Sequence, residues 1–342
     1  MSASNTEIEQ LQEELKNLAD EVAQKRDEQY DCQFTDISNN VQPLIRINLK
    51  TRRTLKGHLS KIYDLSWNKY KILTVSQDGK AMLWDAISAN KLQRVPLKTQ
   101  WVQTCEYDPK GTQFACGGLD ARITIYSLAD QENIKVTANH DEHTGYISDI
   151  KWADEKTIVS SSGDKSCVIF DVEANTKIAS MTEHMEDILS IDLDPAEQTF
   201  LSTGCDKTIR LWDIRQQKVV QTYYGHDADI SYIKFFPSKR AFATASDDTT
   251  CKLFDLRHFD TEIMTYHHDS YKCAATCLEF SKSGRMMIAG YENYNCSLYD
   301  VLKGDRIGVL SGHDDKISCM GMNSEGIALA TGSWDSFIKI WQ

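Results

Sequence analysis

The sequence is short of several features that mark membrane, secreted or nucleic-acid-binding proteins. It has no apolar run long enough to span a bilayer and no hydrophobic region of a secretory signal, so we expect no transmembrane segment. Basic residues are in deficit, because 38 Lys and Arg against 50 Asp and Glu leave a net charge of −12. Since a phosphate backbone is bound through a basic surface, we expect no nucleic-acid partner.

Motifs for lipidation, zinc binding and catalysis are missing as well. Residue 2 is serine rather than the glycine that myristoylation requires, and the chain ends in KIWQ without a prenylation box. The ten cysteines include no Cys-x-x-Cys pair, so we expect no metal and a reducing cytoplasmic compartment. No GxSxG, GxxxxGK[ST] or HExxH motif occurs. We therefore expect no catalytic residue, no cofactor, and membrane contact only through the lipids of a partner.

What the sequence does contain is a long repeat. Residues 225–255 open with Gly-His, alternate apolar and polar residues across two turns, and close with Phe-Asp. Period-2 alternation between turns predicts short antiparallel strands. Equivalent closing aromatics recur at intervals of 42 to 45 residues, at Trp84, Tyr126, Phe170, Trp212, Phe254, Tyr299 and Trp341. A unit of this length with GH and WD punctuation is typical of a WD-repeat blade, so we predict an all-β, seven-bladed β-propeller.

The first 42 residues differ from this repeat, because they contain no glycine and no proline. Their apolar residues follow the alternating 3-4 spacing of a coiled coil, which predicts an N-terminal coiled-coil α-helix and connector over residues 1–42. We expect its apolar seam to bind a helix of another chain; the alternative is an amphipathic helix packed on its own domain. The seam consists of Ile8, Leu11, Leu15, Leu18 and Val22.

The last repeat is one strand short, because the chain ends one residue after Trp341. Three strands fit after Gly312-His313, and an unclosed sheet edge is a liability. Residues 43–54 read as a strand ahead of the first repeat. We therefore predict a propeller over residues 43–342, in which residues 43–54 supply the outer strand of the last blade.

Histidine and aspartate recur at matched places in most repeats, which raises the alternative of a propeller hydrolase or lyase. Because a catalyst needs one site, a constellation repeated around the ring indicates a structural role. We expect each histidine to hydrogen-bond the aspartate six residues before the closing aromatic and to fix a tight turn. Representative pairs are His58 with Asp78, His226 with Asp248, and His313 with Asp335.

The residue that opens each inner strand is expected to lie at the mouth of the central channel. Fold stability requires nothing particular here, yet the seven positions hold Trp, Tyr, two Lys and two Asp. Aromatic residues beside fixed charges are the composition of a protein-binding hot spot. Trp334 is expected on the same face, although it and Trp101 have the alternative of plugging the mouth as core residues. The seven positions are Lys61, Trp101, Tyr146, Asp187, Asp229, Ala274 and Lys316.

With these features together, the chain resembles the beta subunits of heterotrimeric G proteins nearly from end to end. The similarity covers the N-terminal coiled-coil pattern and the runs TRRTLKGHLSKIY (51–63), FATASDDTTCKLFDLR (242–257) and ATGSWDSFIKIW (330–341). The resemblance implies a surface for the GDP-bound alpha subunit and for effectors. The residues that match this surface are Leu59, Lys61, Tyr63, Lys80, Lys91, Trp101, Leu119, Tyr146, Asp187, Asp229, Asp247 and Trp334.

The resemblance also implies an obligate gamma subunit on the Ile8–Val22 seam and work at the cytoplasmic face of the plasma membrane and in the cytoplasm. Two rim positions depart from the family's usual methionine, since this chain has Gln103 and Leu189. Alpha-subunit and effector choice is therefore expected to differ. The alternative function is a WD-repeat scaffold or adaptor outside G-protein signalling.

Overall fold

The computed structural model describes residue 38 and residues 41–129, 134–258, 261–268 and 273–342. The chain divides into two compact units, Met1–Pro43 and Leu44–Gln342. In the first unit, the described residues include one backbone hydrogen bond, from Val41 N to Ser38 O at 3.3 Å. The predicted coiled-coil helix and its seam from Ile8 to Val22 lie outside the described residues.

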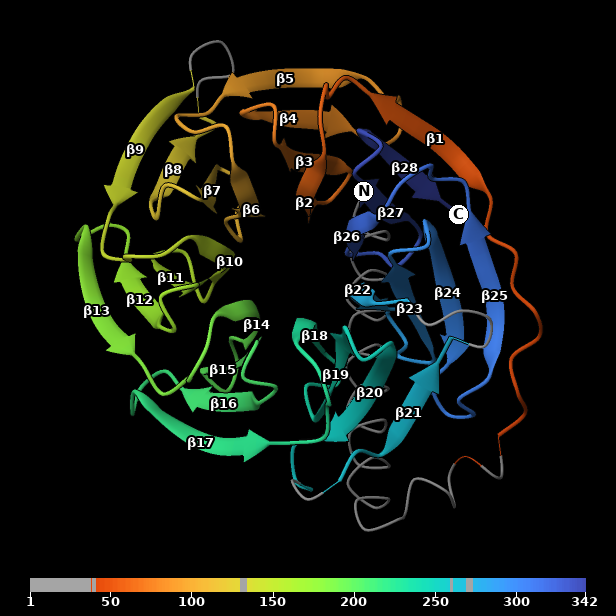
Figure 1. The fold of residues 1–342 in the computed structure, drawn as a ribbon. Helices are drawn as coiled ribbons and strands as arrows, with labels where there is room; N and C mark the ends of the chain where they lie inside the picture. Colours follow the sequence, from red (N-terminus) through yellow and green to blue (C-terminus); the bar gives the residue numbers. More distant parts are fainter. Residues whose placement is uncertain (1–37, 39–40, 130–133, 259–260, 269–272) are drawn as a thin grey trace, which may run out of the picture. The chain divides into compact units, whose positions relative to one another are not determined.

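The second unit is a ring of seven four-stranded antiparallel sheets around a central channel (Figure 1). The first three blades are β2 (Ile62–Asn68), β3 (Lys71–Ser76), β4 (Lys80–Asp85) and β5 (Lys91–Pro96); β6 (Val102–Tyr107), β7 (Gln113–Gly118), β8 (Ile123–Ser127) and β9 (Lys135–His140); and β10 (Ile147–Trp152), β11 (Thr157–Ser162), β12 (Cys167–Asp171) and β13 (Thr176–Met181).

The next three blades are β14 (Ile188–Asp194), β15 (Thr199–Gly204), β16 (Ile209–Asp213) and β17 (Lys218–Tyr223); β18 (Ile230–Phe235), β19 (Ala241–Ser246), β20 (Thr250–Asp255) and β21 (Met264–His267); and β22 (Ala275–Phe280), β23 (Met286–Tyr291), β24 (Asn295–Asp300) and β25 (Arg306–Ser311). The seventh combines β26 (Ile317–Met322), β27 (Leu329–Ser333) and β28 (Phe337–Trp341) with β1 (Thr51–Lys56). The predicted seven-bladed all-β propeller is confirmed.

The core lies between neighbouring blades, where apolar residues of one sheet pack against those of the next. The seven closing aromatics are all buried near the end of the third strand of their blade, with the largest exposed fraction at 4%. Each such side chain contributes roughly 2–3 kcal/mol through apolar burial. The repeat of the sequence is therefore a repeat of anchored aromatic side chains.

The ring is closed by β1, which comes from the start of the propeller and pairs antiparallel with β28 at its end. The register runs from Thr51 opposite Trp341 to Lys56 opposite Phe337. Lys50 and Gln342 extend the ladder by exchanging two backbone hydrogen bonds of 3.1 Å. This pairing removes the open edge that a three-stranded last blade would expose.

The strand predicted over residues 43–54 is shorter and begins later than the sequence suggested. Residues 44–49 instead follow the sixth blade: Leu44 N donates to Asp300 Oδ2 at 3.0 Å, and Ile47 N donates to Ile307 O at 3.1 Å. Gly308 permits this approach, because an added Cβ would lie 2.5 Å from Ile47 O. The segment joins blades 6 and 7, whereas its alternating sequence alone indicated only one strand.

Candidate protein-binding face

The mouth of the channel is built from one backbone contact repeated in all seven blades. In each blade, the carbonyl of the residue before the inner strand accepts a hydrogen bond from the residue after the second strand, at 2.9 to 3.1 Å. The seven acceptor–donor pairs are Lys61–Gln77, Trp101–Leu119, Tyr146–Gly163, Asp187–Cys205, Asp229–Asp247, Ala274–Glu292 and Lys316–Trp334. Two residues per blade are therefore fixed at the mouth, and we call these fourteen residues the rim.

A second ring of side chains comes from a bulge in each inner strand. The register to the second strand shifts at the second residue of all seven inner strands, as between Ile62 and Asp64. A bulge bends the strand and redirects a side chain that regular alternation would place elsewhere. The bulged residues are Tyr63, Gln103, Ser148, Leu189, Ser231, Thr276 and Ser318.

Trp334 forms the centre of an aromatic and basic cluster between blades 7 and 1. The ammonium of Lys61 lies 3.6 Å from the centroid of the Trp334 ring, and that of Lys316 lies 5.1 Å away. The Tyr63 ring packs against Trp334 edge-on at 6.2 Å. Cation–π contacts between partly exposed side chains contribute about 1 kcal/mol each. Lys316 is also held by Glu292 at 2.7 Å, so the cluster is positioned before any partner arrives.

Trp101 and Leu119 give the mouth its exposed apolar surface. Trp101 is 44% exposed and Leu119 is 48% exposed, although the backbone bond between them holds both in place. Trp101 is thus not a core plug. Trp334 is half-buried among its lysine neighbours, and its Nε1 is buried without a hydrogen-bond partner within the described part of the chain.

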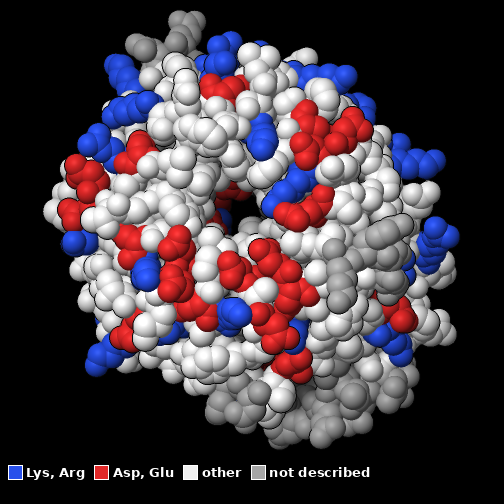
Figure 2. Space-filling view, in the orientation of Figure 1, with Lys and Arg blue, Asp and Glu red and all other residues white. Residues whose placement is uncertain are grey.

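Acidic side chains occupy the opposite side of the mouth, on blades 4 and 5. Tyr146 donates its hydroxyl to Asp187 Oδ2 at 3.0 Å, and Ser231 donates to Asp247 Oδ1 at 2.9 Å. Burial, followed by the bond to Asp187, raises the pKa of Tyr146 well above its usual value, so this phenol remains a donor. Figure 2 shows red side chains gathered beside the channel over β14 to β20. The mouth is therefore basic and aromatic on one side and acidic on the other.

The first-blade residues named by the resemblance lie at two different ends of that blade. Leu59 is 82% exposed, and its amide donates to Asp78 Oδ2 on the mouth face. Lys80 begins β4 opposite Pro96, whereas Lys91 begins β5 opposite Trp84. Because β5 runs antiparallel to β4, Lys91 lies toward the face opposite the mouth. The predicted surface thus includes the mouth and extends down the side of blade 1.

Comparison with known proteins places this geometry in a family. The family model described as G protein beta WD-40 repeat protein matches residues 5–342. A curated relative from Homarus americanus, named guanine nucleotide-binding protein G(I)/G(S)/G(T) subunit beta-1, is 48% identical over 338 residues, covering 98% of this chain and 99% of the relative.

The chain belongs to the G protein beta family. The resemblance stated from the sequence is confirmed. G protein beta subunits are non-enzymatic transducers. No group of three or more His, Cys, Asp or Glu able to hold a metal occurs among the residues described. Within the same residues, no helix has the length and apolarity needed to cross a membrane.

Five blades of this G protein beta chain contain the hydrogen-bond network that the sequence suggested. The histidine Nδ1 lies 2.6 to 3.3 Å from the aspartate, and its Nε2 lies 2.6 to 2.8 Å from a Ser or Thr of the second strand. The pairs are His58–Asp78, His143–Asp164, His184–Asp206, His226–Asp248 and His313–Asp335. Burial by itself would raise the pKa of Asp248, but the hydrogen bonds from His226 and Thr250 together with the charge of His226 outweigh burial and lower it.

The network holds a strained turn, since the residue after each of the seven Asp or Asn positions has a positive φ between 59° and 76°. Only Gly79 among them is glycine; the others include Lys165, Lys207 and Thr249. A left-handed conformation costs roughly 1–2 kcal/mol for a residue with a side chain. The aspartate offsets this cost by accepting hydrogen bonds from both sides of the turn, as Asp248 does from Thr250 N and Asp227 N.

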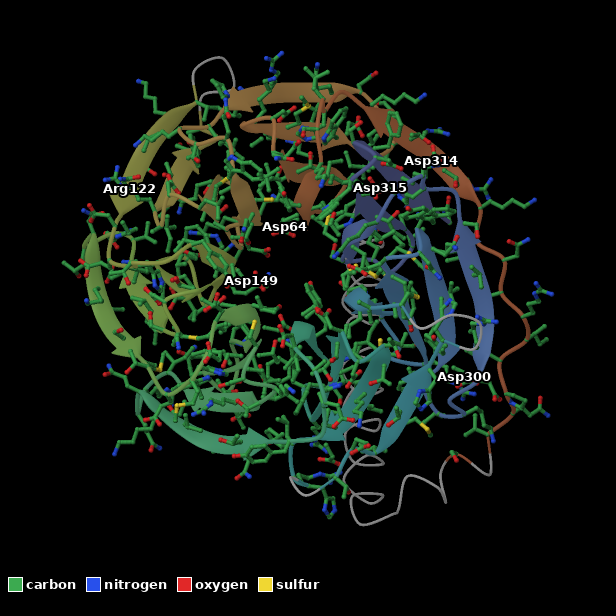
Figure 3. All side chains as sticks on the ribbon, viewed as in Figure 1. Asp64, Arg122, Asp149, Asp300, Asp314 and Asp315 are labelled. Carbon is green, nitrogen blue, oxygen red and sulfur yellow. The ribbon has the colours of Figure 1, made fainter. Side chains whose placement is uncertain are left out.

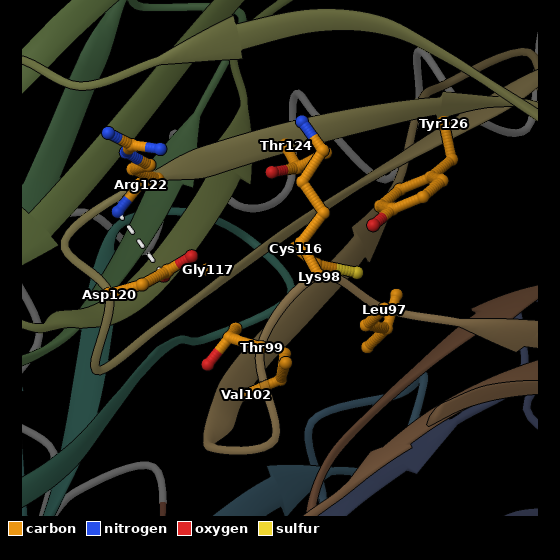
Figure 4. A pocket seen from close by; sticks show the side chains of 10 residues that line it. All are labelled: Leu97, Lys98, Thr99, Val102, Cys116, Gly117, Asp120, Arg122, Thr124 and Tyr126. Atoms are coloured by element: carbon orange, nitrogen blue, oxygen red, sulfur yellow. Dashed lines mark hydrogen bonds between the residues drawn. The ribbon is translucent and has the colours of Figure 1, made fainter. Parts of the chain in front are cut away.

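Blade 2 lacks this network. Lys98 stands where five of the other blades have the networked histidine, and Cys116 replaces the Ser or Thr. Asp120 accepts a hydrogen bond of 3.4 Å from the Arg122 amide in place of one from a histidine. Figure 4 shows the resulting hollow, lined by these residues and Tyr126, with an internal volume of about 10 Å³. This volume suits about one water molecule, so the hollow holds no organic ligand.

Some rim residues were not singled out from the sequence, although a positional signal for them exists. Gln77, Cys205 and Glu292 each directly precede the Asp or Asn of the turn, as Trp334 and Asp247 do. The position directly before the turn Asp or Asn would therefore have identified the second residue of every rim pair. Gln103 and Leu189, the two departures from the family pattern, are both half-buried bulged residues of the second ring.

Proposed function

We propose that this protein is the beta subunit of a heterotrimeric G protein that binds a gamma subunit constitutively and a GDP-bound alpha subunit reversibly. It transduces receptor signals to effectors at the cytoplasmic face of the plasma membrane. The observation that carries this proposal is the preformed mouth: exposed Trp101 and Leu119 stand between the Lys61–Trp334 cluster and the acidic residues of blades 4 and 5.

The mouth suits a partner segment of both charge signs. A helix across the channel would place apolar residues on Trp101 and acidic residues near Lys61, with basic residues near Asp187 and Asp229. Rim charges set register and association rate, and the buried aromatic anchors supply most of the affinity. The alpha-subunit surface in this proposal comprises Leu59, Lys61, Tyr63, Lys80, Lys91, Trp101, Leu119, Tyr146, Asp187, Asp229, Asp247 and Trp334.

The side of blade 1 suits an elongated segment of the alpha subunit. Lys80 and Lys91 mark opposite ends of strands of six residues each, which extend about 17 Å at 3.3 Å per residue. A helix of the alpha subunit laid along this side would contact Leu59 and Lys80 near the mouth and Lys91 at the opposite end of the blade. Effectors that use the mouth would compete with the alpha subunit, because both require Trp101.

The gamma subunit is assigned to the N-terminal seam of Ile8, Leu11, Leu15, Leu18 and Val22, on the strength of its heptad spacing. Glu14 and Glu21 at g positions favour basic residues on the partner helix. Membrane attachment then comes from the lipid of the partners. The altered bulged residues Gln103 and Leu189 lie where alpha and effector preference would be set.

Affinity purification of the tagged full-length chain from its native membranes tests the proposal. We expect a small prenylated helical protein in every preparation. An alpha subunit should be present with GDP and released by a non-hydrolysable GTP analogue. Partners that ignore the nucleotide, with no small helical protein, would contradict the proposal and favour a WD-repeat scaffold.

A further inference from the structure

Charged side chains form a belt around the inside of the channel. Five residues after the mouth position, five successive inner strands carry alternating charges, which is unusual for side chains this enclosed. Blades 1 and 7 have the uncharged Ser66 and Gly321 at the equivalent place. The belt consists of Glu106, Lys151, Asp192, Lys234 and Glu279.

The belt is unevenly compensated between the two halves of the ring. In blades 5 and 6, Lys234 pairs with Glu279 at 3.4 Å. In blades 2 and 3, one ammonium serves two carboxylates: Lys151 Nζ lies 3.0 Å from Asp149 Oδ1 and 3.7 Å from Glu106 Oε2.

A third carboxylate, Asp64 of blade 1, adds to this side. Its Oδ2 accepts from Thr104 Oγ1 at 3.0 Å and from Cys105 N at 2.9 Å, which connects β2 to β6. Asp149 Oδ2 connects β10 to β14 in the same way, accepting from Ser190 and Ile191. Figure 3 shows Asp64 and Asp149 beside the channel.

We call Asp64, Glu106, Asp149 and Lys151 the three-acid cluster. With every group ionised its net charge would be −2, and both aspartates have fixed bonding duties between blades. The charged groups on the neighbouring strands do not neutralise this negative charge. Asp192 of β14 is itself an acid, and Lys234 of β18, on the same strand as Tyr232, is paired with Glu279 of β22. Because an enclosed carboxylate without its own cation favours the neutral form, one member of the cluster should hold a proton.

Glu106 is the member best placed to take that proton. Within the described residues its side chain makes no hydrogen bond to a neighbouring blade, and its 3.7 Å distance to Lys151 is longer than the 3.0 Å distance from Asp149. Partial burial raises its pKa to about 7, an upper value because 29% of the side chain remains exposed to channel water; the attraction of Lys151 opposes the rise and the charge of Asp64 adds to it. Burial raises the pKa of Asp64 to about 6. Lys151 stays charged, since Asp149 and Glu106 outweigh burial and raise its pKa.

We propose that the three-acid cluster is a proton-binding site whose occupancy stabilises the sector formed by blades 1 to 3. This inference does not depend on the proposed function. A carboxyl whose pKa is higher in the folded chain contributes stability that is complete below its unfolded value and lost as pH rises through the folded value. For Glu106 this window extends from about 4.5 to about 7. The stabilised sector, blades 1 to 3, includes Lys61, Trp101 and Tyr146 of the mouth.

Thermal unfolding of the full-length chain, with any subunit that co-purifies, tests the proposal at about pH 8 and about pH 6 and at constant ionic strength. Glu106→Gln imitates the protonated carboxyl, so the variant should unfold at a higher temperature than the wild type at pH 8. The difference between the two should narrow by up to about tenfold in the folding equilibrium at pH 6, and it should vanish only below about pH 4.5. The corresponding gain in the folding equilibrium at pH 8 is at least tenfold, with roughly 300-fold as the upper limit before screening by channel water.

Glu279→Gln is the matched control, at the same belt position in blade 6. It removes the carboxylate nearest to Lys234, so it should lower the unfolding temperature at both pH values. The variants must be compared with one another at each pH, because His140 changes the stability of every variant with pH in the direction opposite to Glu106. Burial lowers the pKa of His140, which costs stability as pH falls below about 6.5.

Titration of side-chain carboxyl signals in a ¹³C-glutamate-labelled wild type provides a second measurement that needs no variant. We expect one glutamate to titrate near pH 7 and to disappear from the spectrum of Glu106→Gln. The proposal is overturned when every glutamate titrates below about pH 5.5. It is equally overturned when the stability difference between Glu106→Gln and wild type is the same at both pH values.

Discussion

Replacing Trp101 with alanine removes a large, partly exposed aromatic side chain from the mouth without disturbing its frame. The backbone bond from Leu119 N to Trp101 O does not depend on the side chain, so the rim should keep its geometry. A tryptophan offers up to about 250 Å² of surface, and 44% of it is exposed, which leaves about 110 Å² for a partner to cover. At about 25 cal/mol per Å², Trp101→Ala should cost about 2–3 kcal/mol of binding free energy.

Calorimetric titration with a GDP-bound alpha subunit measures this cost as a rise of roughly 30- to 150-fold in Kd. Ile327→Ala is the matched control, because Ile327 is also exposed, at 53%, but lies in the turn after β26 on the face opposite the mouth. The control should bind as the wild type does. Equal affinities for Trp101→Ala and wild type, with both chains folded, would refute the assignment of the mouth.

The remaining predictions concern the seam and the turns. Leu15→Asp with Leu18→Asp places charges in the heptad seam, so co-purification of a small helical subunit should be lost; its retention would exclude the seam as the contact. Asp248→Ala leaves the buried His226 without its carboxylate and should destabilise the chain by roughly 2–4 kcal/mol in denaturant titration. Because the pKa of Asp248 is lowered in the folded chain, its contribution is present above about pH 4 and lost as pH falls, so the variant's deficit should shrink toward pH 3. Thr249→Gly relieves a β-branched residue at φ 76° and should raise stability by about 1 kcal/mol; a lower unfolding temperature would show that the turn is unstrained.

The sequence predicted the propeller well because its period is set by local chemistry. Buried closing aromatics such as Trp212 and turn residues such as Asp206 recur at nearly fixed intervals, so strand number and blade number follow from spacing alone. Closure of the ring was predicted in the same way, because the last repeat lacks one strand and an additional strand precedes the first repeat. Its boundary was wrong by several residues, because the alternation over residues 44–49 reflects packing on blade 6 rather than pairing with β28.

The site was predicted less completely than the fold. Position in the repeat located Trp101 and Tyr146 on the rim, but a bulge that redirects Gln103 has no sequence pattern of its own. The separation of Lys80 from Lys91 appears only when β4 and β5 are paired. The sequence did not predict the three-acid cluster for a similar reason. The alternation pattern marks Asp64 and Glu106 only as polar positions. They come near Lys151 only when the blades pack side by side in the ring.

Amide hydrogen exchange of the full-length chain, alone and with a GDP-bound alpha subunit, would locate the binding face without any substitution. We expect new protection at the mouth, in the segments around Trp101, Leu119 and Trp334, and along the outer strands of blade 1. Exchange in the turns on the opposite face, at residues 108–112 and 323–327, should not change. Protection confined to those opposite turns, with the mouth unaltered, would contradict the proposed binding face.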